Sequence, residues 1–391
     1  MTARRASDAV PTTLEQLLAA KEIVVTCGSG GVGKTTTAAA LATMAAVHLG
    51  GKVLVLTVDP ARRLATAMGL ERFGNVEVQV PHETFAAAGL DPRGELWAAM
   101  LDTKQSWDDL VRRHAPDAQT RDAILANPLY QNVTGKFVQS HDYIAMERLY
   151  DLHASGTYDL IVVDTPPTRN ALDFLEAPER MADFFSSRLL RWLLAPYRSR
   201  FVNAASRPFY QVADRILGSA FLQDIAEFFI LFQSMYDGFV ERARAVERVL
   251  EDRRTTFVVV STLESGPAQE AEFFIGALGE KRLHLGALVL NKVLPSYLLD
   301  AEATRTASRL CAEPAAVAAL LPADLGEPDM VERVLREIGE SFRNFQVAAK
   351  REATQRAELA GAPEVTASVP YFDTDIYDLS GLARLGEELW R

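Results

Sequence analysis

A glycine-rich stretch near the start of the sequence has the residue types of a loop that binds phosphate groups. It fits the pattern G-x-x-x-x-G-K-[ST] and reads Gly28-Ser29-Gly30-Gly31-Val32-Gly33-Lys34-Thr35, followed by Thr36. Glycines here let backbone N–H groups turn toward phosphate oxygens without a Cβ in the way. We expect Lys34 to reach the β- and γ-phosphates of a bound nucleotide, and the Thr35 hydroxyl to ligate Mg²⁺.

Two aspartates each end an apolar run. Asp59 ends the run 52–59, where a carboxylate could orient or deprotonate an attacking water. An Asp-Pro pair before a helix is also ordinary capping chemistry, so both interpretations of Asp59 stay open at this point. Asp164 ends the run 158–164 after four apolar residues, which fits a carboxylate that supports the Mg²⁺ coordination shell.

Asn291 closes another apolar run, 283–291. Its side-chain amide offers both a donor and an acceptor, which suits the edge of an adenine base. Asparagine is also routine where a strand ends in a turn. From this residue alone, the turn is the preferred interpretation.

Six short runs rich in β-branched residues alternate with helical stretches. They span residues 22–27, 52–59, 158–164, 255–262, 283–291 and 364–372. Runs of this kind are typical of a parallel sheet covered by helices on both faces, and such sheets bind ligands at the carboxyl ends of their strands. The sequence therefore predicts an α/β fold with the polar residues named above gathered at one edge of the sheet.

Two long stretches, about 85–155 and 172–253, interrupt this alternation with helical periodicity and no convincing strand. We predict one domain over 21–391 that carries both helical inserts, preceded by a disordered tail at 1–20. Two arginines near the start have no apolar segment behind them, which argues against a signal peptide. The apolar runs are too short to cross a bilayer, so we expect a soluble, cytoplasmic protein.

The composition limits the kinds of partner and metal site that the protein is expected to have. The 391 residues carry a net charge of −11, which disfavours binding to a nucleic-acid backbone. Cys27 and Cys311 are far apart in the sequence and form neither a disulfide framework nor a C-x-x-C metal pair. The six histidines show no metal-ligand spacing, so the sequence predicts no metal centre beyond the Mg²⁺ of the phosphate loop.

Together these segments resemble the ArsA-type ATPases, the arsenite-transporting and tail-anchored-protein-targeting family within the deviant-Walker class of P-loop proteins. The resemblance covers nearly the whole chain. It rests on the segments GSGGVGKTT (28–36), VDPARRLA (58–65), DTPPTRNALDFL (164–175), STLES (261–265) with QEAEFF (269–274), LVLNKVLP (288–295) and VPYFDTDIYDLSGLARL (369–385). It implies a parallel P-loop NTPase sheet of the SIMIBI class, with an inserted helical subdomain.

The resemblance also implies roles for individual residues. It implies a Mg²⁺-dependent ATPase that works as a dimer, in which Asp59 positions the attacking water. Glu264 would face the nucleotide across the dimer. The adenine ring would be contacted by Asn291 and, in the C-terminal loop, by Pro370 and Phe372. The segment after Asp164 departs from the family's D-T-A-P-T-G-H-T-L-R at Pro166, Arg169, Asn170, Ala171 and Asp173.

Ser29 stands where the family usually has a second lysine, which reaches phosphates bound by the other subunit. A serine hydroxyl is short and uncharged and does not replace that cation. Three interpretations follow. The chain pairs with a lysine-bearing relative, which we favour; or Arg62, Arg63 or Arg169 supplies the charge; or the chain binds nucleotide and hydrolyses it poorly.

The partner implied by the resemblance is a hydrophobic protein segment, held in a Met-rich helical groove. Residues 172–253 contain only two methionines, Met181 and Met235, beside many aromatic and leucine residues. A packed helical core or a dimer surface is therefore the preferred interpretation of this insert. The chain lacks both a zinc C-x-x-C pair and a cysteine trio for arsenite, so arsenite transport is disfavoured.

Two further classes of function compete with an ATPase that drives a conformational change. One is a nucleotide-dependent binding or regulatory subunit with little hydrolysis, which the serine at position 29 favours. The other is a positioning ATPase of the MinD or ParA kind. The last helix, LSGLARLGEELW, is amphipathic but acidic, which is a poor match to an anionic membrane.

Overall fold

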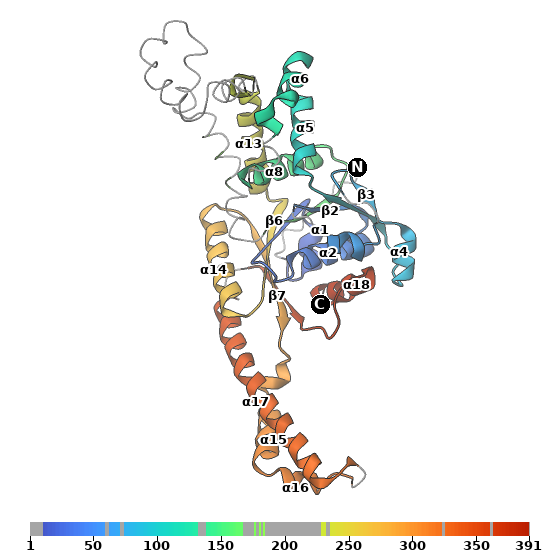
Figure 1. Cartoon of the computed structure of the whole chain (residues 1–391), viewed down its shortest axis with the longest axis vertical. Helices are drawn as coiled ribbons and strands as arrows, with labels where there is room; N and C mark the ends of the chain where they lie inside the picture. The colour runs from blue at the N-terminus through green and yellow to red at the C-terminus, as the bar shows by residue number, and fades with distance from the viewer. Residues whose placement is uncertain are drawn as a thin grey trace, which may run out of the picture.

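An eight-stranded sheet forms the centre of the molecule (Figure 1). The computed structural model describes residues 11–58, 62–70, 74–131, 138–166, 176, 180, 183, 228–231, 235–322, 325–359 and 363–390. The strands are β1 (Ile23–Cys27), β2 (Gly51–Thr57), β3 (Val78–Gln79), β4 (Gly94–Met100), β5 (Leu160–Asp164), β6 (Thr255–Ser261), β7 (Leu285–Val293) and β8 (Val365–Pro370). Their order is β3-β4-β2-β5-β1-β6-β7-β8, and only β3 and β4 pair antiparallel. The predicted α/β fold is confirmed.

Helices cover both faces of the sheet, and each face has its own apolar core. One face packs against α1 (Leu14–Ala19), α2 (Lys34–Met44), α3 (Arg62–Ala67), α4 (His82–Ala87) and α18 (Leu379–Trp390). The other packs against α5 (Thr103–His114), α6 (Ala118–Ala126), α8 (Val138–Ala154), α13 (Tyr236–Glu251) and α14 (Ser265–Glu280). Because both faces are buried, the inner strands need apolar residues at every position, which explains their near-continuous apolar runs.

The prediction that residues 85–155 contain no strand is wrong. Strand β4 lies in this stretch and pairs with β2 over seven residues, from Gly94 to Met100. Its sequence, GELWAAM, contains a glutamate and two alanines, residue types that are depleted in strands. Small side chains at Ala98 and Ala99 are fully buried here, so packing on the sheet overrides the weak propensity.

The prediction of disorder over 1–20 is wrong for its second half, since α1 is an ordered helix. Leu14, Leu17 and Leu18 are fully buried on one face of the helix. Thr13 caps the start, because its hydroxyl accepts the backbone N–H of Gln16, and the Gln16 side chain accepts the N–H of Thr12 in return. This reciprocal cap and the i, i+3, i+4 leucines are readable signals of a helix.

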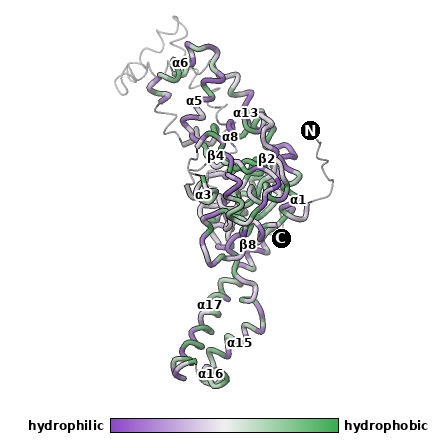
Figure 2. The backbone as a smooth tube through the Cα atoms, turned by 90° about the vertical axis from the view of Figure 1, so that its right-hand side faces the viewer, coloured by the Kyte–Doolittle hydropathy of each residue, from purple (hydrophilic) through white to green (hydrophobic). Residues whose placement is uncertain are grey.

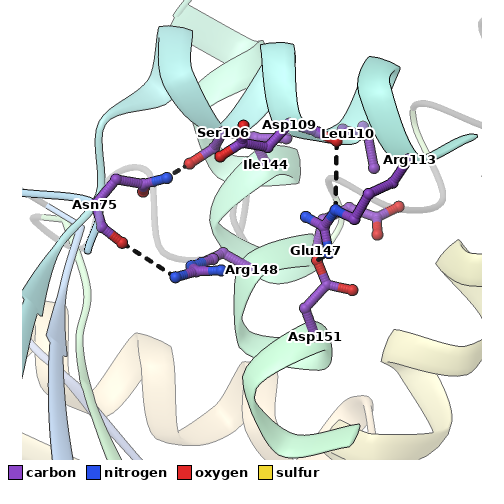
Figure 3. A pocket seen from close by; sticks show the side chains of 9 residues that line it. All are labelled: Asn75, Ser106, Asp109, Leu110, Arg113, Ile144, Glu147, Arg148 and Asp151. Atoms are coloured by element: carbon purple, nitrogen blue, oxygen red, sulfur yellow. Dashed lines mark hydrogen bonds and ion pairs between the residues drawn. The ribbon is translucent and has the colours of Figure 1, made fainter. Parts of the chain in front are cut away.

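Helices α5, α6, α8 and α13 form a helical region at one end of the molecule (Figure 1). A small polar cavity of about 10 Å³ lies between α5 and α8 (Figure 3), enough for about one water molecule. Asn75 ties this region to the segment before β3. Its side chain accepts from Ser106 Oγ at 2.8 Å, and its backbone carbonyl accepts from Arg148 at 3.0 Å.

An ion pair is buried where α8 meets α13. Arg242 Nε donates to Glu147 Oε1 at 3.1 Å, the Tyr143 hydroxyl donates to the same carboxylate, and the Glu147 side chain is only 1% exposed. Burial raises the pKa of Glu147, while the charge of Arg242 opposes that rise. Removing one partner would leave an uncompensated buried charge, so this pair holds α8 and α13 in one relative position.

A helical arm projects from the opposite end of the molecule (Figures 1 and 2). It connects β7 to β8 and consists of η2 (Ser296–Leu299), α15 (Ala301–Ala312), α16 (Pro314–Ala318) and the 32-residue α17 (Pro328–Leu359). The sequence analysis did not separate this arm as an insert. Among the described helices, none is both long and apolar enough to cross a membrane.

Helices α15 and α17 pack closely at Gly339. A Cβ on this residue would lie 2.7 Å from Cys311 Sγ and 2.8 Å from the carbonyl oxygen of Ala307. Both distances are shorter than van der Waals contact, so the absence of a side chain at Gly339 is what lets the two helices pack.

We expect Gly339→Ala to destabilise the arm by about 1–3 kcal/mol, because the added methyl group forces the two helices apart. Gly276→Ala is the matched control, since Gly276 lies inside α14 with nothing near its missing Cβ. Removing that glycine should stabilise its helix by about 0.5–1 kcal/mol. Urea unfolding measures both effects, and hydrogen exchange of residues 301–359 and 265–280 assigns each effect to its own helices. Effects of the same sign would contradict the close contact at Gly339.

Candidate nucleotide site

The phosphate loop lies between the end of β1 and the start of α2, at the carboxyl edge of the sheet. Gly33 caps α2 with a φ of 98°, a left-handed conformation that favours glycine. A Cβ there would lie 2.4 Å from the Asn291 amide nitrogen. The N-terminus of α2 points toward the loop and favours an anion there.

A wholly buried carboxylate joins three elements at this edge. Asp164, at the end of β5, accepts the Thr35 hydroxyl at 2.7 Å and the Thr57 hydroxyl at 3.0 Å, both at Oδ2. Thr35 belongs to α2 and Thr57 ends β2. A threonine hydroxyl and an aspartate in contact at a phosphate loop are the groups that hold Mg²⁺ beside a nucleotide, so the residues present fit a magnesium–nucleotide complex.

Lys34 begins α2 and is 7% exposed. Its ammonium donates to the Ser29 carbonyl oxygen at 2.9 Å, so it bridges the two ends of the loop. A cation at this place offers three donors to phosphate oxygens. Gly28 to Gly33 thus form the turn between β1 and α2, and Lys34 to Thr36 begin the helix with a buried positive charge.

Asn291 lies within β7, at its carboxyl end, and touches the phosphate loop directly. Its Nδ2 donates to the Val32 carbonyl oxygen at 2.8 Å, and its Oδ1 accepts the backbone N–H of Lys292 at 2.9 Å. The side chain is therefore engaged with the protein on both of its polar atoms. Its contact with adenine stays a prediction.

The other residues predicted to contact nucleotide lie at the same edge of the sheet. Glu264 is exposed and precedes α14, and Pro370 is exposed at the end of β8. Phe372 is half-buried against the core, and the Arg384 guanidinium lies 4.7 Å from the centre of its ring. No contact among the described residues assigns these three a ligand, so their roles stay predictions.

Several predicted residues lie outside the described structure. Asp59 follows the last described residue after β2, and Arg169 follows Asp164 by five positions; neither is described. Arg62 and Arg63 begin α3, but their side chains are not described. The catalytic role of Asp59 and the three arginine alternatives therefore stay predictions.

Thr57 was not predicted as a site residue from the sequence. It ends a buried strand two positions before Asp59, and its hydroxyl is fully buried against Asp164. A polar residue at the carboxyl end of an apolar strand was the available signal, the same one that identified Asp164. Thr57 thus connects the strand that leads to Asp59 with the predicted metal carboxylate.

Cys27 ends β1 directly before the loop but has no reactive character. It is fully buried, and burial raises the pKa of its thiol far above the usual range. A thiol held neutral in this way is not a nucleophile at ordinary pH. The interpretation of Cys27 as a small buried residue is confirmed.

The comparisons with known proteins agree with this geometry. The sequence profile of the anion-transporting ATPases matches residues 21–309. The chain belongs to the anion-transporting ATPase family. It is 27% identical to ATPase GET3 of Malassezia globosa over 289 residues, which cover 73% of this chain and 78% of that protein. It is also 27% identical to ATPase ASNA1 homolog 1 of Paramecium tetraurelia over 271 residues, covering 68% and 73%.

A third relative is an uncharacterized protein of Streptomyces coelicolor, 31% identical over 271 residues, which are 68% of this chain and 61% of that protein. Membership of the family identifies the chain as an ATPase of the ArsA and GET3 type, and the predicted resemblance is confirmed. The family match ends inside α15. Most of the arm therefore lies beyond the residues that the family profile matches.

Replacing the buried carboxylate tests the metal assignment. We expect Asp164→Asn to weaken ATP binding in Mg²⁺ by at least about tenfold, because an amide of the same size cannot supply the negative charge. In EDTA the variant and the unmodified protein should bind ATP alike. Calorimetric titration measures both.

Asp102→Asn is the control, since Asp102 caps α5 through its side chain and asparagine caps equally well. An Asp164→Asn protein whose ATP affinity still rises with Mg²⁺ would contradict the assignment.

Proposed function

We propose that this protein is a Mg²⁺-dependent ATPase in which ATP binding and hydrolysis drive an open–closed change of the helical region. The observation that carries the proposal is the contact of Thr35 and Thr57 with the buried Asp164. These three residues belong to α2, β2 and β5, so a ligand that rearranges one contact acts on all three elements.

In this account, the loop's own residues bind and orient the nucleotide. Lys34, which now donates to the Ser29 carbonyl, would hold the phosphates, and the Thr35 hydroxyl, which now donates to Asp164, would hold the metal. Mg²⁺, when bound, neutralises phosphate charge and supports the departure of the terminal phosphate. Asp164 would support the metal's coordination shell with the carboxylate that now accepts the Thr57 hydroxyl.

Asp59 is proposed to orient the attacking water. It follows Thr57 by two residues at the end of β2, and a carboxylate is a suitable acceptor for a water proton. Because Thr57 bonds Asp164, the position of β2's end depends on the state of the metal site. This dependence supports a coupling between metal binding and the catalytic carboxylate.

The helical region has a physical connection to this part of the chain. Asn75, in the segment that follows α3, bonds both Ser106 of α5 and Arg148 of α8. A movement of α3 would therefore pull on the helical region, which supports an open–closed change there.

We propose a dimer as the working unit, a hydrophobic protein segment as its client, and the cytoplasm as its compartment.

A nucleotide-dependent binding subunit with little hydrolysis is the second candidate. It is favoured by Ser29, whose side chain brings no charge to the loop. A membrane-positioning ATPase finds less support. The leucines on the apolar face of α18, Leu379, Leu382, Leu385 and Leu389, are buried, and Gly386 of this helix contacts Met44 of α2.

The rate of ATP hydrolysis distinguishes an ATPase from a nucleotide-dependent binding subunit. We expect the purified chain to hydrolyse ATP in Mg²⁺, and Lys34→Ala to lose tight ATP binding and turnover together, because the cation and its donors are gone. Asp59→Asn should keep ATP bound but stop hydrolysis. Phosphate release and equilibrium binding measure these effects, and native mass spectrometry of the complex from its own cells identifies any second subunit.

Tight ATP binding without turnover would favour the binding subunit. Turnover that appears only with a lysine-bearing relative would establish an unequal dimer. Unchanged ATP binding by Lys34→Ala would contradict the loop assignment itself.

A further inference from the structure

Lys292, which was not predicted as a site residue, reaches the phosphate loop from β7, two strands away from β1 in the sheet. Its ammonium nitrogen lies 3.5 Å from the Gly31 carbonyl oxygen. The preceding residue, Asn291, donates to the next carbonyl of the loop, that of Val32. Two consecutive side chains of β7 thus face two consecutive carbonyls of the loop.

The backbone of β7 is deformed at the point where these side chains leave it. Leu290 pairs with Ser368 and Val293 pairs with Pro370, so two residues of β7 stand opposite one residue of β8. This is a β-bulge, a feature that redirects side chains and is frequent beside active sites. Lys292 has a φ of 58°, a left-handed conformation that costs free energy for a residue with a Cβ.

Among the described residues, only Lys292 and Arg282 are non-glycine residues with positive φ. The backbone N–H of Lys292 is held by the side-chain oxygen of Asn291 at 2.9 Å, so the bulge is stabilised by the same asparagine that bonds the loop. A strained conformation that persists beside a ligand site is a reason to look for a role.

The role follows from the geometry of a peptide unit. The carbonyl of one residue and the N–H of the next lie in one plane and point in opposite directions. If Lys292 holds the Gly31 carbonyl away from the phosphate site, the N–H of Val32 points toward that site. If Asn291 holds the Val32 carbonyl away, the N–H of Gly33 points toward it in the same way. Those N–H groups belong to the part of the loop that surrounds phosphate.

We propose that Lys292 is a positioning residue of the nucleotide site, which together with Asn291 fixes two peptide planes of the phosphate loop with their N–H groups toward the phosphates. This inference rests on the proposed binding of ATP by this loop. It goes further by assigning the end of β7 a role in phosphate binding rather than in binding the base alone.

The proposal makes a distinction that inorganic pyrophosphate can test, since pyrophosphate has phosphates but no base or ribose. We expect Lys292→Met to weaken MgATP and magnesium pyrophosphate by the same factor, about tenfold, the effect of losing one hydrogen bond that orients the loop. Methionine keeps the aliphatic stem and a Cβ at the strained φ, so it removes mainly the charge and the donor. Lys292→Arg should restore most of the affinity for both ligands.

Arg282→Met is the matched control. Arg282 is also basic and has a φ of 56°, but it follows α14 at the opposite, amino-terminal end of β7. It should leave both affinities unchanged. Urea unfolding without ligand should show that Lys292→Met folds as stably as Arg282→Met, which separates a binding effect from loss of structure.

Three outcomes would overturn the proposal. The Lys292→Met protein could bind both ligands as tightly as the unmodified protein. It could lose affinity for ATP alone, which would make Lys292 a contact for the base or ribose. Or Lys292→Arg could fail to restore affinity, which would reduce the residue to a structural one. If the unmodified protein binds neither ligand, it is the proposed function that fails.

Discussion

The contact of Asp164 with Thr35 and Thr57 is the interaction on which the organisation of this protein depends. It joins the phosphate-loop helix, the strand that leads to Asp59 and the central strand β5 through one buried oxygen atom. A carboxylate without solvent around it is unfavourable unless hydrogen bonds or a cation compensate its charge. In the proposed function, a bound metal would take the place of hydroxyl partners of Asp164, and this exchange would act on all three elements.

The surrounding fold offers a physical route by which a change of partners at Asp164 would reach distant parts of the protein. Both faces of the sheet are closely packed, so a displacement of one strand would be transmitted to the helices packed against it. On one side, Asn75 ties the segment after α3 to the helical region. On the other, the bulge at Asn291 and Lys292 ties β7 to the loop, and β7 continues into the arm.

Much of the fold and of the candidate site was predictable from the sequence, because the residue patterns that indicate them lie in short, contiguous segments. The phosphate loop has a dense residue pattern, and Asp164 and Asn291 each end an apolar run. Thr57 carried a similar signal and was overlooked because Asp59 lies so near. The cap and leucines of α1 were also local signals. Strand β4 was missed because its glutamate and alanines have low strand propensity, and only its pairing with β2 and β3 makes it a strand.

The orientation of Lys292 could not be predicted, because it depends on a bulge between β7 and β8, whose pairing partners are far apart in the sequence. The most direct measurement of the central claim is a crystal structure of the protein with MgADP and a phosphate analogue. The account predicts phosphates within the loop of residues 28–36, Thr35 on the metal and Asp164 directly behind it. Nucleotide bound away from this loop, or a metal that touches neither Thr35 nor the shell held by Asp164, would contradict it.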